Sequence, residues 1–335
     1  MEALKVIKPK RLSLGRSFKP GLIPTLKRHQ YQVEYGRSIM GDQPKQFIRV
    51  YEYEEGADRR KIKPKTWPLY IAKTAEKWYP NESITEHLLN RIGECWRMPM
   101  AESRLVWANG QVRFLSLYFL NDGCEELTHG ADILAGFFND RTFIKEIERL
   151  KKEREFISVH LFQEALAFIF PDHHIDLFRG FVRMLLLDAL VGNNDRHFWN
   201  YGVIRDVIGQ QPPRFSPVFD TARGLYWNTR EEEIVVLQPD KQRRDQNLNK
   251  YVRKSQPKMS WDGVPNITHI EMVNQIAETE LGVSMTEIRE FYHPAKLAPC
   301  IAMIDREFTG LFSPERLDMI KRCLSMRLEL INNIL

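Results

Sequence analysis

The feature that most constrains the fold of this chain is a long apolar segment that runs directly into a cluster of polar residues. Residues 175–190 have the periodicity of a buried helix. Residues 193–200 follow at once and read Asn-Asn-Asp-Arg-His-Phe-Trp-Asn. Asn and Asp favour turns over regular structure. We therefore expect a polar loop whose position is fixed by a helix inside the core.

Two short strands are predicted after this loop. Residues 201–205 have the pattern of a strand, and residues 215–220 have the pattern of its hairpin partner. Such a hairpin would return Asp220 to the side of Asn200. The sequence thus predicts that polar side chains from two separate segments meet beside the loop.

Three oxygen-bearing side chains would then lie together. Asp195 can take a proton from a hydroxyl group, as a general base does. Asn200 offers an amide oxygen and Asp220 a carboxylate, a mixture of hard ligands that suits Mg²⁺ bound to phosphate groups. The alternative interpretation is a helix end followed by a capped loop, because turns rich in Asn and Asp are common.

A strand with a lysine and a helix with a glutamate precede this loop in the chain. Residues 69–74 read Leu-Tyr-Ile-Ala-Lys-Thr, and Lys73 near the end of this apolar strand is a candidate phosphate ligand. The helix expected over residues 81–96 carries Glu86, which could pair with Lys73 and fix its ammonium group. Glu82 is the alternative partner, although a carboxylate in the first turn is also explained by the helix dipole.

Glycines come before the lysine strand. Gly36 and Gly41 flank Ser38, and Lys45 leads into an alternating, strand-like segment. Glycines let backbone N–H groups approach phosphate groups closely, and Lys45 would add positive charge. The spacing is neither that of a Walker loop nor the Gly-x-Gly-x-x-Gly pattern of ordinary protein kinases.

Taken in this order, the segments resemble the HipA-like serine/threonine kinases, the toxins of bacterial toxin–antitoxin systems. The glycine loop of that family reads roughly Ser-x-x-Gly-x-Gln-x-Lys and its catalytic loop Asn-x-Asp-x-His-x-x-Asn. Its metal-binding aspartate follows in a Pro-x-x-Asp context. The likeness covers about residues 30–300. The matching residues are Ser38, Gly41, Gln43, Lys45, Asn193, Asp195, His197, Asn200, Pro217 and Asp220.

The resemblance implies a two-lobed α+β kinase fold that uses ATP and Mg²⁺. It implies catalytic roles for Lys73, Asp195 and Asn200, and metal binding by Asn200 and Asp220. The residues implied in nucleotide binding are Gly41, Gln43, Lys45, Lys73, Glu86 and His197, with the adenine read by backbone groups near Tyr118 and Leu120.

The resemblance also implies partners and regulation. Ser38 would be autophosphorylated, and the added charge would repel ATP phosphates from the glycine loop. The substrate would be a protein, with an aminoacyl-tRNA synthetase as one candidate. A small antitoxin is the expected partner, and nucleic acid would be reached only through it. The chain resembles short members of the family, which lack an extra N-terminal subdomain.

Three regions are predicted along the chain. Residues 1–28 carry eight Lys or Arg against one acid and are expected to form an irregular basic arm. Residues 29–120 are expected to form a small mixed lobe, in which Asn109-Gly110 marks a hairpin turn. Residues 121–335 are expected to form a larger, mainly helical lobe.

Within the helical lobe, helices are predicted over residues 162–170, 267–281 and 314–335 in addition to the helix before the polar loop. Residues 231–238 are expected to add a short strand. Residues 241–258 are rich in Lys, Arg, Gln and Asn and fit either a surface helix or a mobile loop.

Composition excludes several classes of protein. The four cysteines are scattered without a Cys-x-x-Cys pair, so a structural zinc site is not expected. The first residues are too polar for a signal peptide, and no apolar run reaches the roughly 18 residues of a membrane helix. We therefore expect a cytoplasmic protein that does not enter a membrane.

Two other functions compete with an active kinase. One is a binding or regulatory protein with a degenerate kinase fold, but Lys73, Asp195, Asn200 and Asp220 are all present. The other is a nucleic-acid-binding regulator, for which the basic arm is the only support. The net charge of +5 gives no strong overall field in its favour.

Overall fold

The small N-lobe is built on a five-stranded antiparallel sheet with the strand order β1-β2-β3-β5-β4. The computed structural model describes residues 3–13, 20–36, 44–52, 61 and 63–335. The strands of this sheet are β1 (Tyr31–Val33), β2 (Lys45–Val50), β3 (Leu69–Lys73), β4 (Ser103–Ala108) and β5 (Gln111–Leu117).

The β4–β5 hairpin closes at the predicted turn. Asn109 and Gly110 both have positive φ values, +48° and +76°, and Ala108 pairs with Gln111 across the turn. Two left-handed residues match the twist of the flanking strands, which explains why Asn-Gly favours this connection. The hairpin places β5 beside β3, at the centre of the sheet.

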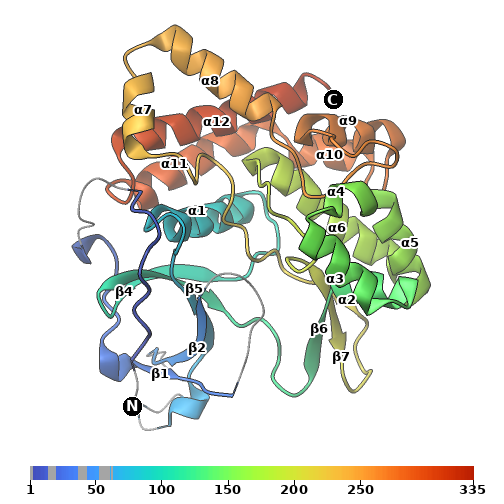
Figure 1. Cartoon of the computed structure of the whole chain (residues 1–335), viewed down its shortest axis with the longest axis horizontal. Helices are drawn as coiled ribbons and strands as arrows, with labels where there is room; N and C mark the ends of the chain where they lie inside the picture. Colours follow the sequence, from blue (N-terminus) through green and yellow to red (C-terminus); the bar gives the residue numbers. More distant parts are fainter. Residues whose placement is uncertain (1–2, 14–19, 37–43, 53–60, 62) are drawn as a thin grey trace.

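Helix α1 (Asn81–Cys95) joins the N-lobe to the rest of the molecule. It packs on β4 and β5 on one side and on α11 (Leu297–Phe308) on the other (Figure 1). Its buried residues Ile84 and Leu88 belong to the same apolar core as the helices of the C-lobe. The position of α1 is therefore fixed by both lobes.

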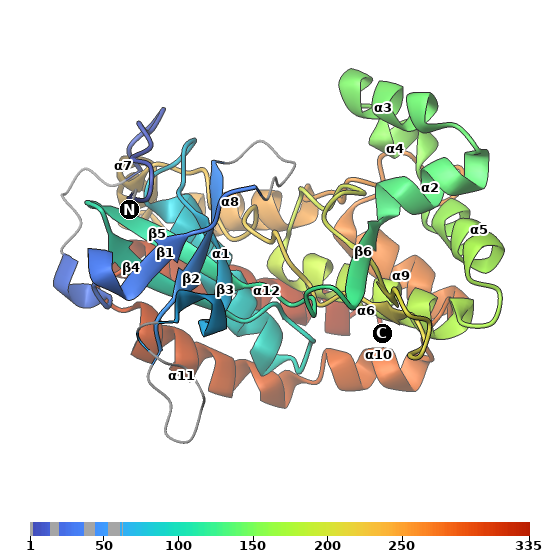
Figure 2. The same ribbon diagram turned by 90° about the horizontal axis from the view of Figure 1, so that it is seen from below.

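The C-lobe is mainly helical, with a three-stranded sheet of order β6-β7-β8 at its side. Figure 2 shows α2–α5 at the opposite end of the molecule from the N-lobe sheet. The strands are β6 (Glu125–His129), β7 (Gly202–Asp206) and β8 (Arg214–Phe215). The remaining helices are α2 (Gly130–Phe138), α3 (Arg141–Leu150), α4 (Glu153–Phe156), α5 (Val159–Ile169), α6 (His174–Val191), α7 (Glu231–Leu237), α8 (Lys241–Arg253), α9 (His269–Thr279), α10 (Met285–Phe291) and α12 (Pro314–Asn332). Four short 3₁₀ turns, Pro20–Leu22, Arg28–Gln30, Pro64–Thr66 and Pro294–Lys296, complete the regular structure that is described. None of the helices in the described residues has both the length and the apolar content needed to cross a bilayer.

The prediction of a strand over residues 231–238 was wrong, because this segment forms α7. Its first turn carries three glutamates, which the positive end of a helix dipole favours. Ile234 and Leu237 are buried, at helical spacing, while Val235 and Val236 are exposed. The segment 241–258, for which two interpretations were open, forms a helix over Lys241–Arg253.

The predicted hairpin after the polar loop is present but shorter than expected. β8 pairs with β7 only at Arg214 and Phe215. Val218 instead pairs with the N-lobe: its N–H donates to the Pro99 carbonyl (2.8 Å), and its carbonyl accepts from Ala101 N–H (3.0 Å). The chain leading to Asp220 is thus fixed to both lobes.

The basic N-terminal arm packs on the N-lobe where it is described. Leu4 is buried, and its N–H donates to the Tyr31 hydroxyl (3.2 Å). Arg113 of β5 donates to the Lys5 carbonyl (2.7 Å), and the Asn109 side chain donates to the Leu4 carbonyl (2.7 Å). The hydrogen bonds use the backbone of the arm, and the side chains of Lys5, Lys8, Lys10 and Arg11 are exposed.

Candidate functional site

The polar loop begins where α6 is forced to end. Gly192 has a φ of +66°, the left-handed conformation that terminates many helices. A Cβ atom at Gly192 would lie 2.3 Å from the guanidinium of Arg327, so a side chain is excluded by space as well. The Asn193 N–H then bonds back to the Asp188 carbonyl (3.0 Å), which turns the chain into residues 194–200.

A buried set of polar residues fixes the loop, and we call it the Asp188–Arg196 network; it consists of Asp188, Asn193, Arg196 and Thr221. Arg196 donates two hydrogen bonds to Asp188 (2.8 and 2.9 Å) and one to the Thr221 hydroxyl (2.7 Å). Asn193 donates to the same carboxylate (2.9 Å). The Asp188 and Arg196 side chains are each only 1% exposed, so this is a two-pronged ion pair inside the core.

The network also brings the two predicted metal-ligand segments together. Arg196 Nη1 donates to the carbonyl oxygens of both Asn200 (3.0 Å) and Phe219 (2.6 Å). Because one nitrogen binds both carbonyls, the backbone of Asn200 and that of Phe219, the residue before Asp220, are held together, although the paired part of the hairpin ends at Phe215. Asn200 Nδ2 donates to the Asp195 carbonyl (3.0 Å), which leaves its Oδ1 as the atom suited to a metal.

Across from this loop lies a group of four charged residues, Lys45, Lys73, Glu86 and Asp220, which we call the lysine–carboxylate centre. The predicted ion pair is present: Lys73 Nζ lies 2.6 Å from Glu86 Oε1. Lys73 also contacts Asp220, and Lys45 Nζ lies 3.0 Å from the other oxygen of Asp220. Lys45 and Lys73 meet because β2 and β3 pair them directly.

The electrostatics of Lys73 follow from its burial. Burial lowers the pKa of Lys73 to about 8, and the nearby charge of Lys45 adds to this effect, while Glu86 opposes it. Glu86 is almost fully buried, and its second oxygen has no hydrogen-bond partner among the described residues. The centre therefore holds strongly interacting charges whose bonding capacity is not saturated.

Asp195 lies in a cationic environment. Its Oδ1 is 2.7 Å from Arg223 Nη1. Burial raises the pKa of the Asp195 carboxyl, and the positive charges of Arg223, Lys258 and Lys77 oppose the rise. These cations come from three different parts of the chain, and motif reasoning identified none of them.

The other predicted residues have a mixed outcome. His197 helps to close the loop, because its carbonyl accepts from Asn200 N–H (2.8 Å) and its Nδ1 from Trp199 N–H (3.3 Å). The Tyr118 N–H donates to the Leu69 carbonyl (2.8 Å) and so extends the pairing beyond β3, and the adenine contacts predicted near Tyr118 and Leu120 stay a prediction. Ser38, Gly41 and Gln43 lie outside the described residues.

The donor set fits a magnesium ion held together with phosphate oxygens. The residues that the structure describes contain no cluster of three His, Cys, Asp or Glu side chains that could hold a metal alone. One amide oxygen and one carboxylate, from Asn200 and Asp220, are the small protein contribution that Mg²⁺ needs when a nucleotide supplies further oxygens.

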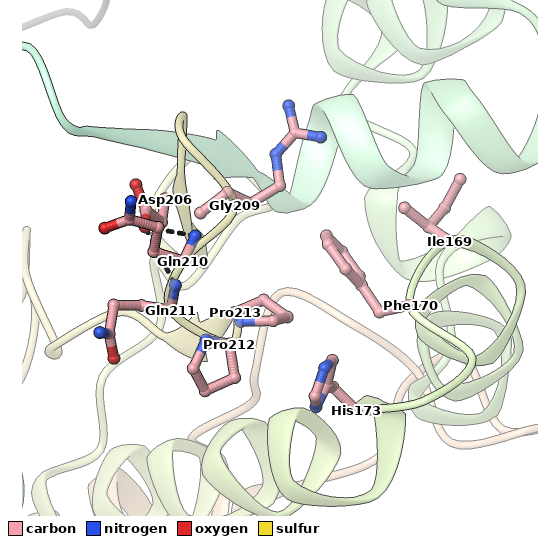
Figure 3. A pocket seen from close by; sticks show the side chains of 10 residues that line it. Ile169, Phe170, His173, Asp206, Gly209, Gln210, Gln211, Pro212 and Pro213 are labelled. Carbon is pink, nitrogen blue, oxygen red and sulfur yellow. Dashed lines mark hydrogen bonds between the residues drawn. The ribbon is translucent and has the colours of Figure 1, made fainter.

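A pocket elsewhere holds none of the predicted site residues. It has a volume of about 520 Å³ and lies between the end of α5, the start of α6 and the turn after β7 (Figure 3). Phe170, His173, Pro212 and Pro213 form part of its wall. The Asp206 carboxylate in this wall is already bonded to the N–H groups of its own turn. The pocket therefore offers no constellation for phosphate chemistry.

The fold and this site define a protein of the two-lobed kinase class. The crystal structure of the Helicobacter pylori proinflammatory kinase CtkA has the same fold, with a TM-score of 0.69 and 17% identity over 93% of this chain and 96% of that chain. A weaker likeness, with a TM-score of 0.45 and 16% identity over 88% of this chain and 64% of that chain, is to HipA in the Shewanella oneidensis MR-1 complex of HipA, HipB and operator DNA.

The family is shown by the sequence itself. The profile of the HipA-like C-terminal domain matches residues 37–281, so this chain belongs to that family. A search of curated protein sequences gave no match. Family membership confirms the predicted resemblance to HipA-like kinases, and the similarity to CtkA confirms the predicted two-lobed fold.

Proposed function

We propose that this protein is an ATP- and Mg²⁺-dependent serine/threonine protein kinase of the HipA-like toxin type. The observation that supports this most strongly is the lysine–carboxylate centre, in which Lys73 contacts both Glu86 and Asp220. An ammonium group on a strand, a helix glutamate that holds it and a metal-binding aspartate are the parts that kinases combine around ATP phosphates.

Each residue has a distinct task in this proposal. Asp195 accepts the proton of the substrate hydroxyl as its oxygen bonds to the γ-phosphorus of ATP and the bond from that phosphorus to the β-phosphate oxygen breaks, so that ADP leaves. Lys73, oriented by Glu86, binds the phosphates, and Asn200 and Asp220 hold Mg²⁺. The metal ion, when bound, neutralises charge on the phosphate oxygens.

Regulation and partners follow from family resemblance. Ser38 would accept a phosphoryl group from the enzyme's own ATP, and the added charge would weaken nucleotide binding at the neighbouring loop. A bacterial protein, with an aminoacyl-tRNA synthetase as one candidate, would be the substrate. A small antitoxin protein would bind the kinase and link it indirectly to nucleic acid.

The test is transfer of label from γ-labelled ATP in the presence of Mg²⁺. The wild-type protein should label itself, with the phosphate located at Ser38 by peptide mass spectrometry. Asp195→Asn removes the base with almost no change in volume and should reduce transfer by about 10²–10⁴-fold. The melting temperature of this variant should stay close to that of the wild type.

A second candidate function is a kinase-fold binding protein that has lost catalysis. It would be favoured if ATP raised the melting temperature of the wild-type protein while no label reached the protein itself or any protein of a bacterial lysate. In that case Asp195→Asn would behave like the wild type in every assay.

A further inference from the structure

Helix α1 directs two buried carboxylates toward the site, and only one is explained by the proposed mechanism. Glu82 and Glu86 are one helical turn apart and are 2% and 1% exposed. Glu86 pairs with Lys73, whereas Glu82 Oε2 has no hydrogen-bond partner among the described residues. A buried carboxylate oxygen without a partner is costly, so its retention calls for a role.

Arg223 forms an ion pair with Asp195, and its charge also acts on Glu82. Arg223 Nη1 lies 2.7 Å from Asp195 Oδ1. Burial raises the pKa of the Glu82 carboxyl, and among nearby charges Arg223 opposes the rise most. The charge of Arg223 therefore acts on a carboxylate of α1 and on the carboxylate of the catalytic loop.

The backbone and side chain around Arg223 are fixed on several sides. Its carbonyl accepts from Asn194 N–H in the catalytic loop (3.2 Å). Its guanidinium lies over the Trp227 ring, 5.2 Å from the ring centroid. At Gly224 a Cβ atom would lie 2.5 Å from the Val191 carbonyl, so only glycine permits this close approach to the end of α6. The segment around Arg223 is therefore held against the catalytic loop and the end of α6.

We propose that Arg223 is a positioning residue for Asp195, and that Glu82 orients Arg223 by its charge. Through these interactions α1 acts on both halves of the site: Glu86 pairs with the phosphate-binding lysine, and the charge of Glu82 acts on Arg223, which pairs with the base. The inference rests on the proposed kinase function and extends it, since the motifs assign no role to Arg223 and named Glu82 only as an alternative partner of Lys73.

The physical reason is orientation. A carboxylate side chain has two rotatable bonds, and a general base must meet the hydroxyl proton at hydrogen-bonding distance. A guanidinium paired with one carboxylate oxygen restricts the side chain and leaves the other oxygen available for the substrate. Misplacement of a reacting group by about 1 Å can cost roughly 10²-fold in rate.

The test compares Arg223→Met, Arg223→Lys and Glu82→Gln with the wild type in steady-state phosphoryl transfer. Arg223→Met should lower kcat by roughly 10–100-fold and change KM for ATP by less than about threefold, because the base and not the nucleotide is misplaced. Arg223→Lys should recover part of the loss. Glu82→Gln should lower kcat by about 3–10-fold, since Glu82 acts on the base only through Arg223.

Two further measurements separate positioning from a general loss of structure. Arg214→Met is the matched control, because Arg214 makes an ion pair of the same length (2.7 Å) with Glu125 at the β8 edge, and it should leave kcat unchanged. The double variant Glu82→Gln/Arg223→Met should be no slower than Arg223→Met alone, because the two residues act through one path. Free guanidinium should restore part of the kcat of Arg223→Ala and none of that of Lys73→Met.

Outcomes that overturn the inference are distinct from failure of the kinase proposal. If the wild type transfers no phosphate, the kinase proposal fails. If the wild type is active and Asp195→Asn is not, but Arg223→Met retains full kcat or exceeds it, Arg223 does not position the base and at most masks it. Additive losses in the double variant would show that Glu82 does not act through Arg223.

Discussion

The Asp188–Arg196 network and the lysine–carboxylate centre are both buried groups of opposite charges, yet they differ in how fully they are bonded. Each oxygen of Asp188 and each terminal nitrogen of Arg196 has a partner, so the ion pair of this network is saturated, although Asn193 Oδ1 has no partner among the described residues. In the centre, the charged group itself is not saturated: Glu86 keeps an oxygen without a partner among the described residues, and the Asp220 side chain is 21% exposed. The comparison teaches that a saturated ion pair supports structure, whereas an unsaturated one beside solvent can exchange partners with a ligand.

The largest effect on stability is expected when the Asp188–Arg196 network is broken. Arg196→Met leaves Asp188 buried without its ion-pair partner and removes the link between the Asn200 and Phe219 segments. Breaking a buried pair costs about 3–5 kcal/mol in the free energy of unfolding. Urea unfolding followed by circular dichroism would measure the loss.

The surface ion pair of Arg214 with Glu125 is again the control for this measurement. Arg214→Met should change the free energy of unfolding by less than about 1 kcal/mol, because exposed pairs contribute little. If Arg196→Met cost no more than Arg214→Met, the network would not be what holds the two segments together.

A smaller effect on stability, with a larger effect on activity, is expected at the lysine–carboxylate centre. Lys73→Met removes a cation whose burial is itself unfavourable, and Lys45 still pairs with Asp220. We expect a loss of about 1–2 kcal/mol in the free energy of unfolding, since the unfavourable desolvation of Lys73 is removed together with its ion pairs. Phosphoryl transfer, in contrast, should fall by at least about 10²-fold.

Calorimetric titration with Mg²⁺–ATP sharpens this comparison. Lys73→Met should weaken nucleotide binding, whereas Arg196→Met, studied under conditions in which it stays folded, should mainly lower kcat. A Lys73→Met variant that bound Mg²⁺–ATP as tightly as the wild type would contradict the role assigned to the centre.

Features of the fold that depend on a few neighbouring residues could be predicted from the sequence. The Asn109-Gly110 hairpin and the end of α6 are set by a few neighbouring residues, and both were predictable. The order of the lysine strand, α1 and the polar loop carried the family resemblance. The strand predicted over residues 231–238 was wrong, because the three glutamates in the first turn favour a helix start over the strand propensity of the β-branched residues that follow.

The contacts that complete the site could not be predicted, because each depends on tertiary packing. Asp188 is the one acid inside the mainly apolar segment 177–191, and an acid in such a segment indicates a buried ion pair, which the motifs did not identify. The pairing of Arg223 with Asp195 had no such signal, since nothing in local sequence says which carboxylate an arginine will meet. Motifs predicted the candidate reacting groups and the pairing of Glu86 with Lys73, but they missed Asp188, Arg196 and Arg223, whose contacts depend on packing.

The smallest predicted effect concerns the pH dependence of stability at His269, which contacts the Asp188–Arg196 network through Asn193. His269 of α9 is buried, with Nε2 3.0 Å from the Asn193 carbonyl and Nδ1 2.8 Å from the Ser255 hydroxyl. A neutral ring that donates from Nε2 and accepts at Nδ1 satisfies both contacts. Burial lowers the pKa of His269 to about 3, and the charge of Arg327 adds to the effect.

The sign of the pH effect follows from this lowered pKa. Between about pH 6.5, where an unfolded histidine titrates, and about pH 3, the unfolded chain binds a proton that the folded chain does not. Stability contributed by neutral His269 is therefore present above pH 6.5 and is lost as the pH falls through this window. Between pH 6.5 and pH 5 we expect a loss of about 1–2 kcal/mol from this group.

His269→Gln is the variant that isolates this contribution. Its amide can donate to the Asn193 carbonyl and accept from Ser255, but it does not titrate. As the pH falls from 7 to 5, the wild type should therefore lose more free energy of unfolding than His269→Gln does. A constant difference between wild type and His269→Gln across this range would mean that His269 does not remain neutral in the folded protein, and that the contact between α9 and the catalytic loop tolerates charge.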